Sequence, residues 1–313
     1  MYDSIDGVCE ITMFGRPSSG PAPVGLARAP ALVIEIPHGA TRTTEYHALR
    51  ALLKGEIAAD LVDFFHVNTD VGAPELGLAV AEAFVTANPG ERACVVRSRI
   101  PRTFIDCNRV IDVAPEFYKE GGVTPGVPPW IKDPDDLALL RRLYGQYAQA
   151  SAAVIDATCG AGGRALFLHT YAPRSVDVEV NDDIVASLHR AYLPEIEPTW
   201  PLRAEVDIIG RGLDGTLHVD AGLLAALVEG YARLGVAVAD GQTYPMHPST
   251  LAYHHTVRHP GRTVCVEIRR DLLADPFTPF AEMRISDEQA RRLAGPLADA
   301  LGVTILTPHF VSE

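Results

Sequence analysis

Short runs of β-branched residues alternate along this chain with longer stretches whose apolar residues recur at helical spacing, and this alternation constrains the fold more than any other feature. It is typical of an α/β protein, in which helices return the chain to a mostly parallel sheet. We expect strands near 31–36, 94–98, 164–169, 204–209 and 263–269, and helices near 46–54, 74–86, 134–157, 219–234 and 286–301.

Local signals support several of these helices. Pro74 suits a first helical turn, and either Asp133 or Asp135 can cap the helix at 134–157. An apolar stripe predicts the buried face of the helix at 219–234: Leu223, Leu224, Leu227, Tyr231 and Leu234. Three segments have the composition of long loops: 15–30, 112–133 and 241–262.

The candidate functional residues are spread from position 38 to position 267, which favours one domain. We expect a single catalytic domain over 1–313, with 1–30 as a partly irregular N-terminal segment.

Composition argues against several classes of protein. A net charge of −13 leaves no surplus of cations to neutralise phosphates, so we expect neither a nucleic-acid partner nor an anionic membrane. The five cysteines are scattered without a C-x-x-C pair, which favours a reducing cytoplasm. The N-terminus lacks a basic segment before an apolar run, and no apolar stretch is long enough to span a bilayer. The sequence therefore predicts a cytoplasmic protein.

Two histidines stand at the ends of predicted strands. His38 follows Leu32-Val-Ile-Glu-Ile-Pro, with a glycine after it, and His169 ends Ala165-Leu-Phe-Leu. Parallel strands release their C-terminal ends at one edge of the sheet, so these imidazoles can meet there and bind a metal. The alternative for each is a structural, hydrogen-bonded histidine.

A carboxylate ligand can come from the segment before the helix at 74–86. Asp70 is the better candidate, although an aspartate here is also a common turn or cap residue. Glu75, in the first turn, is the other candidate, and its alternative role is to complement the helix dipole.

Four polar residues follow the strand at 94–98 within one short segment: Arg102, Asp106, Asn108 and Arg109. The planar fork of Arg109 can grip a substrate carboxylate, with Asn108 adding a hydrogen bond and Asp106 holding an arginine in place. The alternative is a structural arginine–aspartate pair.

Glu267 lies between apolar neighbours in the last predicted strand, so its carboxylate is expected to face something other than open solvent. Beside an activated water it can act as a general base, and the alternative is a salt bridge to Arg269 or Arg270. The loop at 241–262 holds His247, His254, His255 and His259, of which we expect at most one, His254, to contact substrate.

With these residues in place, the chain resembles the N-formylglutamate amidohydrolase family from about residue 31 to residue 275. Five pieces occur in the family's order: Ile-Pro-His38-Gly, Thr-Asp70, Pro-Arg102 through Asp106-x-Asn108-Arg109, a strand ending in His169, and Val-Glu267-Ile-Arg. The resemblance implies a three-layer α/β sandwich around a mixed, mostly parallel sheet, similar to zinc carboxypeptidases.

The resemblance also implies an activity: hydrolysis of an N-acyl amide such as N-formyl-L-glutamate by one Zn²⁺ per chain. Carried over by position, His38 and His169 are metal ligands, with Asp70 as the weaker assignment for the third. Glu267 is the catalytic carboxylate, and Arg109 and Asn108 hold the substrate carboxylate. Arg102 or Arg174 is expected to stabilise the oxyanion, the former as a catalytic group and the latter at the substrate.

The chain departs from the pattern at three places. Thr41 stands where an H-x-x-E motif would have its glutamate, His169 is preceded by Phe167-Leu168, and a histidine-rich segment precedes the catalytic strand. These departures predict a pocket that accepts a different acyl group or amino acid. Two rival hypotheses remain: a related amidase acting on a peptide, cell-wall fragment or other acylated compound, and a non-catalytic binding protein on the same scaffold.

Overall fold

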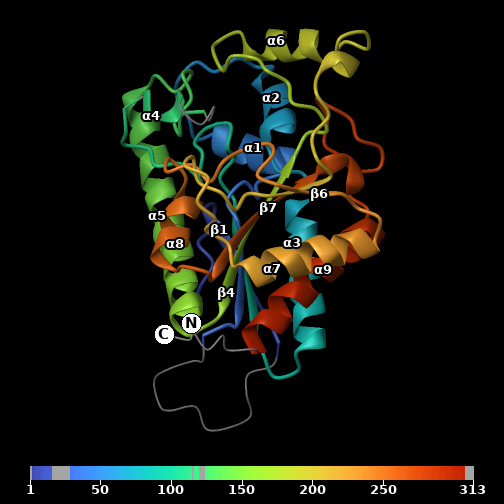
Figure 1. The fold of residues 1–313 in the computed structure, drawn as a ribbon. Coiled ribbons are helices and arrows are strands. Elements are labelled where there is room, and N and C mark those ends of the chain that lie inside the picture. The colour runs from blue at the N-terminus through green and yellow to red at the C-terminus, as the bar shows by residue number, and fades with distance from the viewer. Residues whose placement is uncertain (1, 16–28, 115, 120–123, 307–313) are drawn as a thin grey trace.

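The computed structural model of the protein describes residues 2–15, 29–114, 116–119 and 124–306. Over these ranges the strands form one seven-stranded sheet of order β1-β3-β2-β4-β7-β5-β6 (Figure 1). The four central strands run parallel: β3 (Ala93–Ser98), β2 (Leu32–Ile36), β4 (Arg164–Tyr171) and β7 (Thr263–Arg269). At the edges, β1 (Cys9–Phe14) is antiparallel to β3, β5 (Val206–Ile208) is antiparallel to β7, and β6 (Val238–Asp240) is parallel to β5. The predicted mixed, mostly parallel sheet is confirmed.

Helices cover both faces of this sheet. One face carries α3 (Ala73–Ala87), α7 (Ala221–Arg233) and α9 (Asp287–Leu306), and the other carries α5 (Pro134–Gly160) and α8 (Leu251–Arg258) (Figure 1). The connections hold α1 (Thr43–Arg50), α2 (Leu61–Asn68), α4 (Glu116–Lys119), α6 (Ile184–Ala191) and short 3₁₀ turns at Glu197–Thr199 and Arg270–Leu272. The result is the expected three-layer α/β sandwich. Among the described residues, no helix has both the length and the apolar character needed to span a lipid bilayer.

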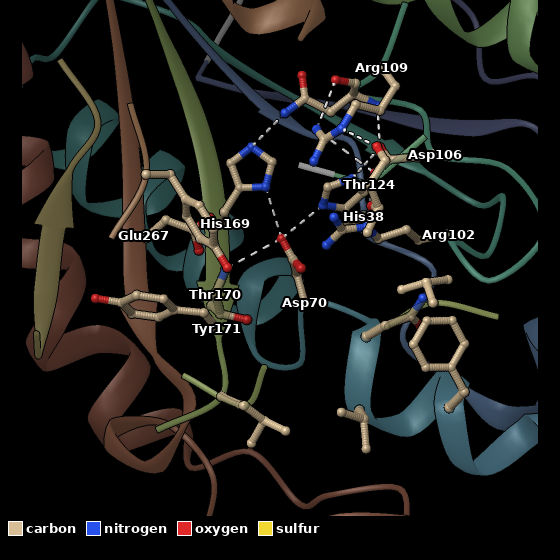
Figure 2. Close-up of a pocket in the computed structure, with 18 of the residues that line it drawn as sticks. His38, Asp70, Arg102, Asp106, Arg109, Thr124, His169, Thr170, Tyr171 and Glu267 are labelled. Atoms are coloured by element: carbon tan, nitrogen blue, oxygen red, sulfur yellow. Dashed lines mark hydrogen bonds and ion pairs between the residues drawn. The ribbon is translucent and has the colours of Figure 1, made fainter. Parts of the chain in front are cut away.

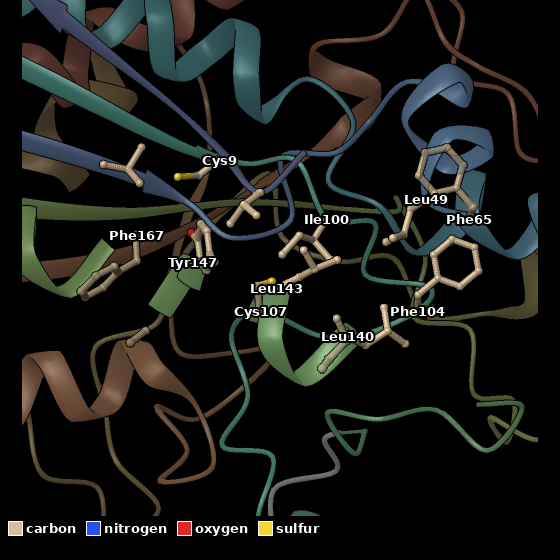
Figure 3. Packing of buried hydrophobic residues seen from close by; sticks show 14 of the residues in the cluster. Cys9, Leu49, Phe65, Ile100, Phe104, Cys107, Leu140, Leu143, Tyr147 and Phe167 are labelled. Atoms are coloured by element: carbon tan, nitrogen blue, oxygen red, sulfur yellow. The ribbon is translucent and has the colours of Figure 1, made fainter. Parts of the chain in front are cut away.

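The two-residue period of the strands divides the core into two apolar layers. On β4, Leu166 and Leu168 pack toward α3, α7 and α9, whereas Phe167 packs on the side of α5. Figure 3 shows this second layer, in which Phe167 and Tyr147 lie between the sheet and α5. His169 and Glu267 keep the same parity as Phe167, so both belong to the α5 side of the sheet.

Glu35 is an exception within the apolar layer on the α5 side. Its carboxyl is buried and accepts hydrogen bonds from the hydroxyls of Tyr147 and Ser151. Burial raises the pKa of Glu35, and the bond from Tyr147 offsets part of that effect. These hydroxyls supply the polar partners that a carboxyl in this position needs.

Local sequence signals correctly predicted the starts of two helices and most of the buried face of a third. Pro74 lies in the first turn of α3, and Asp133 caps α5 by accepting hydrogen bonds from the backbone N–H groups of Asp135 and Asp136. Of the two proposed caps, Asp133 is therefore the one used. The stripe on α7 is buried at Leu223, Leu227 and Tyr231, whereas Leu224 and Leu234 are half-buried.

Other expectations were wrong. The predicted loop at 241–262 contains α8, whose start is capped by the Thr250 hydroxyl at 3.2 Å from the backbone N of Tyr253, and whose buried residues Ala252, His255 and Thr256 have helical spacing. The strands β1 and β6 and the helices α2 and α6 were not predicted, and the predicted loop at 112–133 includes α4. Of the predicted loop at 15–30, residues 16–28 lie outside the described ranges.

Candidate metal site and its cavity

Three side chains meet where the central strands end. His38 follows β2, His169 lies near the end of the neighbouring β4, and their ring centroids are 5.0 Å apart. Glu267 lies on β7, directly opposite His169 in the parallel register. The strand order β2-β4-β7 therefore brings the two histidines and the glutamate to one edge of the sheet, as expected (Figure 2).

The turn after His38 requires glycine. A Cβ atom on Gly39 would lie 2.5 Å from Cγ of Arg97 and 3.1 Å from the carbonyl oxygens of both Ile36 and Ser98. The chain leaving β2 therefore passes directly against the end of β3, and that close approach fixes where His38 stands.

Asp70 supplies a carboxylate between the two imidazoles. Its Oδ2 lies 2.9 Å from Nδ1 of His169 and 3.3 Å from Nδ1 of His38. All three side chains are buried, and one ligand atom from each lies within 4.8 Å of the others. Gly72, with a φ of +87°, turns the chain from Asp70 into α3. This geometry favours Asp70 over Glu75, which instead pairs with Arg42 at 2.6 Å.

Asp70 and the two imidazoles shift each other's pKa values. Burial acts to raise the pKa of Asp70, but the neighbouring imidazoles of His38 and His169 hold it well below its usual value. Burial acts to lower the pKa of His169, yet its hydrogen bond to Asp70 helps to raise it well above the ordinary range. The contact between Asp70 and His169 therefore favours the ionised carboxylate and the protonated imidazole.

Asp106 orients His38 from the other side of the ring. Its Oδ1 lies 2.7 Å from Nε2 of His38 and accepts the backbone N–H of Asn108 at 2.8 Å, while its Oδ2 accepts from Nε of Arg102 at 3.0 Å. A proton on Nε2 leaves the lone pair of Nδ1 directed toward Asp70 and His169. Burial acts to raise the pKa of Asp106, but Arg109, Arg102 and His38 hold it well below its usual value.

The predicted arginine–aspartate contact is therefore present at Arg102. The contact of Asp106 with His38 was missed. Its signal is the short Asp-x-Asn segment after β3, because β3 is the strand beside β2.

Asn108 and Arg109 line the cavity next to His169, but several of their polar atoms already form hydrogen bonds with the protein. The amide nitrogen of Asn108 lies 3.4 Å from Nε2 of His169, and its Oδ1 accepts the backbone N–H of Ala252. Arg109 donates from Nε to the carbonyl of Thr124 and from Nη1 to the carbonyl of Asn108. In contrast, Nη1 and Nη2 of Arg102 make no hydrogen bond to any described residue. Arg102 is thus the better-placed donor for a substrate anion.

Among the described residues, one carboxylate oxygen of Glu267 has no hydrogen-bond partner. Its Oε2 is buried and makes no hydrogen bond within the described ranges. Burial raises the pKa of Glu267, and the nearby His169 acts in the opposite direction. The alternative of a salt bridge to Arg269 or Arg270 is not borne out, because Arg269 pairs with Asp271 at 2.8 Å and Arg270 donates to the carbonyl of Thr170 at 3.1 Å.

These groups open onto a cavity of about 620 Å³. Arg174 lies in its wall as expected, although its Nη1 already donates to the carbonyl of Trp200 at 2.7 Å. His254 was the wrong choice from the histidine-rich segment: it is exposed on α8, whereas His247 lies in the wall. A helix turns successive side chains by about 100°, so the exposed His254 and the buried His255 point in different directions.

The donor set suits a catalytic zinc ion. Two imidazole nitrogens and one carboxylate oxygen are ligands that zinc commonly takes in hydrolases, with a further position left for water or substrate. The Nε2 contact of His38 with Asp106 adds the carboxylate–histidine arrangement that is common around such ions. The cavity residues Arg203 and Arg270 were not anticipated, and nothing in their local sequence marks them.

Comparison with known proteins gives a family and two similar structures. A model of the family described as N-formylglutamate amidohydrolase matches residues 30–274. The crystal structure of N-formylglutamate amidohydrolase from Ralstonia eutropha has 17% identity and a TM-score of 0.53, and the match covers 94% of this chain and 98% of that one. A gene product from Agrobacterium tumefaciens has 18% identity and a TM-score of 0.54, with 95% and 94% covered. These likenesses show the shared fold. No curated protein sequence gives a significant match.

Proposed function

Because the chain belongs to the N-formylglutamate amidohydrolase family, we propose that it is a zinc-dependent amidohydrolase acting on an N-acyl amide of a carboxylate-bearing amino acid, such as N-formyl-L-glutamate. The single observation that carries the proposal is the close group of His38, Asp70 and His169 beside the unpaired carboxylate oxygen of Glu267. If Glu267 had only a structural role, we would expect this buried oxygen to accept a hydrogen bond from the protein.

We assign the metal ligands to Nδ1 of His38, Nδ1 of His169 and a carboxylate oxygen of Asp70. When bound there, a zinc ion polarises the amide carbonyl and makes a water molecule more acidic. Asp106 keeps the His38 ring in the orientation that presents Nδ1.

Glu267 is the proposed general base. It accepts a proton from the water that attacks the carbonyl carbon, and it returns this proton to the nitrogen as the C–N bond breaks. The products are a carboxylate and a free amino acid. The raised pKa of Glu267 suits both steps, because a stronger base takes the proton more readily and its acid form can still release it.

Arg102 is the proposed contact for negative charge. Its terminal nitrogens can receive the substrate carboxylate or the oxyanion, while the bond from its Nε to Asp106 fixes the plane of the guanidinium. Arg109, Asn108 and Arg174 are proposed to shape the same part of the cavity.

Elemental analysis combined with an assay tests this function. Protein purified without chelator should bind about one zinc per chain, and the zinc-loaded protein should release free amine from N-formyl-L-glutamate. The His38→Ala variant should lose zinc, whereas His189→Ala, which removes an exposed histidine paired with Asp63, should keep it. Zinc-free protein after incubation with zinc, or zinc-loaded protein that hydrolyses no amide of an N-acyl amino acid panel, would refute the proposal.

A further inference from the structure

The cavity has an apolar wall that is larger than a formyl group can cover. In the segment after β4, the half-buried Val176, Val178 and Val180 alternate with the exposed acids Asp177 and Glu179. All three valines line the cavity, as does Asp177. The three valines are half-buried and pack against the core on the α5 side, and the surface that they still turn toward the cavity loses its contact with water when a ligand covers it.

Other elements extend this apolar wall. Ile184 and Leu188 stand one turn apart on α6, and Phe64 and Val67 come from α2, which packs beside α6. Trp130 packs edge-on against Phe64 with ring centroids 5.4 Å apart, and its indole N–H donates to the carbonyl of Thr103 at 3.0 Å. We call this set of residues the apolar chamber: Phe64, Val67, Trp130, Val176, Val178, Val180, Ile184 and Leu188.

The size of the cavity points the same way. At about 30 Å³ per molecule, its volume of about 620 Å³ corresponds to roughly twenty waters. A formyl group adds a single carbon to the amino acid, so most of the volume of this cavity would stay filled with water around it. An aromatic or branched acyl group would displace that water.

The two ends of an N-acyl amino acid differ in the surface that they need. The carboxylate is attached close to the amide nitrogen, so Arg102 and the Asp106 segment hold the nitrogen side of the scissile bond. The acyl side extends away from that carboxylate and is free to enter apolar surroundings. Building on the proposed function, we propose that this enzyme prefers N-acyl amino acids with a bulky apolar acyl group, aromatic or branched, which occupies the apolar chamber.

A comparison of three amides tests this preference: N-benzoyl-L-glutamate, N-formyl-L-glutamate and N-formyl-L-phenylalanine. We expect kcat/KM for the benzoyl compound to exceed that of N-formyl-L-glutamate by about tenfold or more, because burying a phenyl ring is worth at least this factor. Equal or faster turnover of N-formyl-L-glutamate overturns the proposal. So does fastest turnover of N-formyl-L-phenylalanine, which would place the amino-acid side chain in the chamber.

A matched pair of variants locates the effect. Val178→Asp puts a charge into the chamber at a half-buried position and should lower the benzoyl-to-formyl ratio of kcat/KM about tenfold or more. Val228→Asp makes the same change at a 42% exposed valine of α7, on the opposite face of the sheet, and should leave the ratio within about twofold. An unchanged ratio in Val178→Asp, with zinc still bound and the fold intact, contradicts the chamber assignment.

Calorimetry separates this proposal from the function on which it rests. The zinc-loaded Glu267→Gln variant is titrated with N-benzoyl-L-glutamate and, separately, with N-formyl-L-glutamate. Binding of the benzoyl compound about tenfold more tightly, equivalent to about 1.4 kcal/mol, supports the chamber even if the native protein hydrolyses neither amide. Equal affinities count against the chamber whether or not hydrolysis occurs.

Discussion

Replacing Asp106 by Asn should weaken zinc binding without touching any proposed ligand. In the native chain, Oδ1 of Asp106 lies 2.7 Å from Nε2 of His38 and its Oδ2 lies 3.0 Å from Nε of Arg102. Asparagine keeps one acceptor oxygen and turns the other into a donor. At one of the two contacts, the new amide N–H group then faces an N–H group of His38 or of Arg102. The two donors repel, so either His38 loses its orientation or Arg102 is displaced.

The expected magnitude follows from the burial of this carboxylate. Loss of the carboxylate partner of a metal-binding histidine weakens affinity by about 10–100-fold, equivalent to about 1.4–2.7 kcal/mol. The side chain of Asp106 is only 4% exposed, so water cannot replace the lost acceptor. We therefore expect the loss of zinc affinity to lie near the upper end of this range.

A competition titration with a chromophoric chelator measures the change in zinc affinity directly. Circular dichroism and thermal melting of the metal-free proteins show whether the variant is folded. Asp156→Asn is the matched control, because Asp156 also contacts a histidine (Nε2 of His259, 2.7 Å) and an arginine (Nη1 of Arg258, 2.9 Å) but is 41% exposed and lies outside the cavity wall. Its zinc affinity should stay within about twofold of the native value.

The result that refutes this reasoning is a folded Asp106→Asn protein with native zinc affinity. Such a result would mean either that His38 needs no carboxylate to orient it or that it does not bind the ion.

Three further predictions concern the site and the core. Glu267→Gln should keep zinc affinity within about threefold while kcat falls by about 10²–10⁴ in steady-state assays, and a fully active variant would exclude the base role. Because Asp70 helps to raise the pKa of His169, zinc must displace a proton at neutral pH. Chelator competition should therefore show affinity falling by up to about tenfold per unit as pH is lowered, and a pH-independent affinity would contradict this. Tyr147→Phe should lower the free energy of unfolding in urea by about 1–3 kcal/mol, because it removes the donor to buried Glu35, and an effect no larger than that of Tyr253→Phe would disprove that role.

Much of the fold follows from local patterns in the sequence. The alternation of strand and helix periods predicted all four central strands and four of the helices that cover them, α3, α5, α7 and α9, because side-chain periodicity directly reflects which face is buried. Short or edge elements such as β1, β6 and α8 were not predicted, because their sequence patterns are brief and their stability comes from tertiary contacts. In α8, for example, the helix has only eight residues, of which Ala252, His255 and Thr256 are buried.

The residues of the candidate site were likewise only partly predictable from the sequence. Sequence alone identified His38, His169 and Glu267, because each is a chemically capable residue in or just after an apolar strand, where parallel sheets gather functional groups. The sequence favoured Asp70 as the carboxylate ligand but left Glu75 open as an alternative. Both residues stand near the start of α3, and only the turn at Gly72 and the pairing of Glu75 with Arg42 separate them.

The sequence by itself determined the α/β architecture and the kinds of side chain available at the strand ends, since residue type and periodicity are local properties. Only the tertiary structure decided which of them meet. The order β2-β4-β7 makes neighbours of strands far apart in the chain, and the path after β3 brings Asp106 onto His38. Such meetings depend on strand order and loop path, which are set by packing of the whole chain and leave no mark on any single segment.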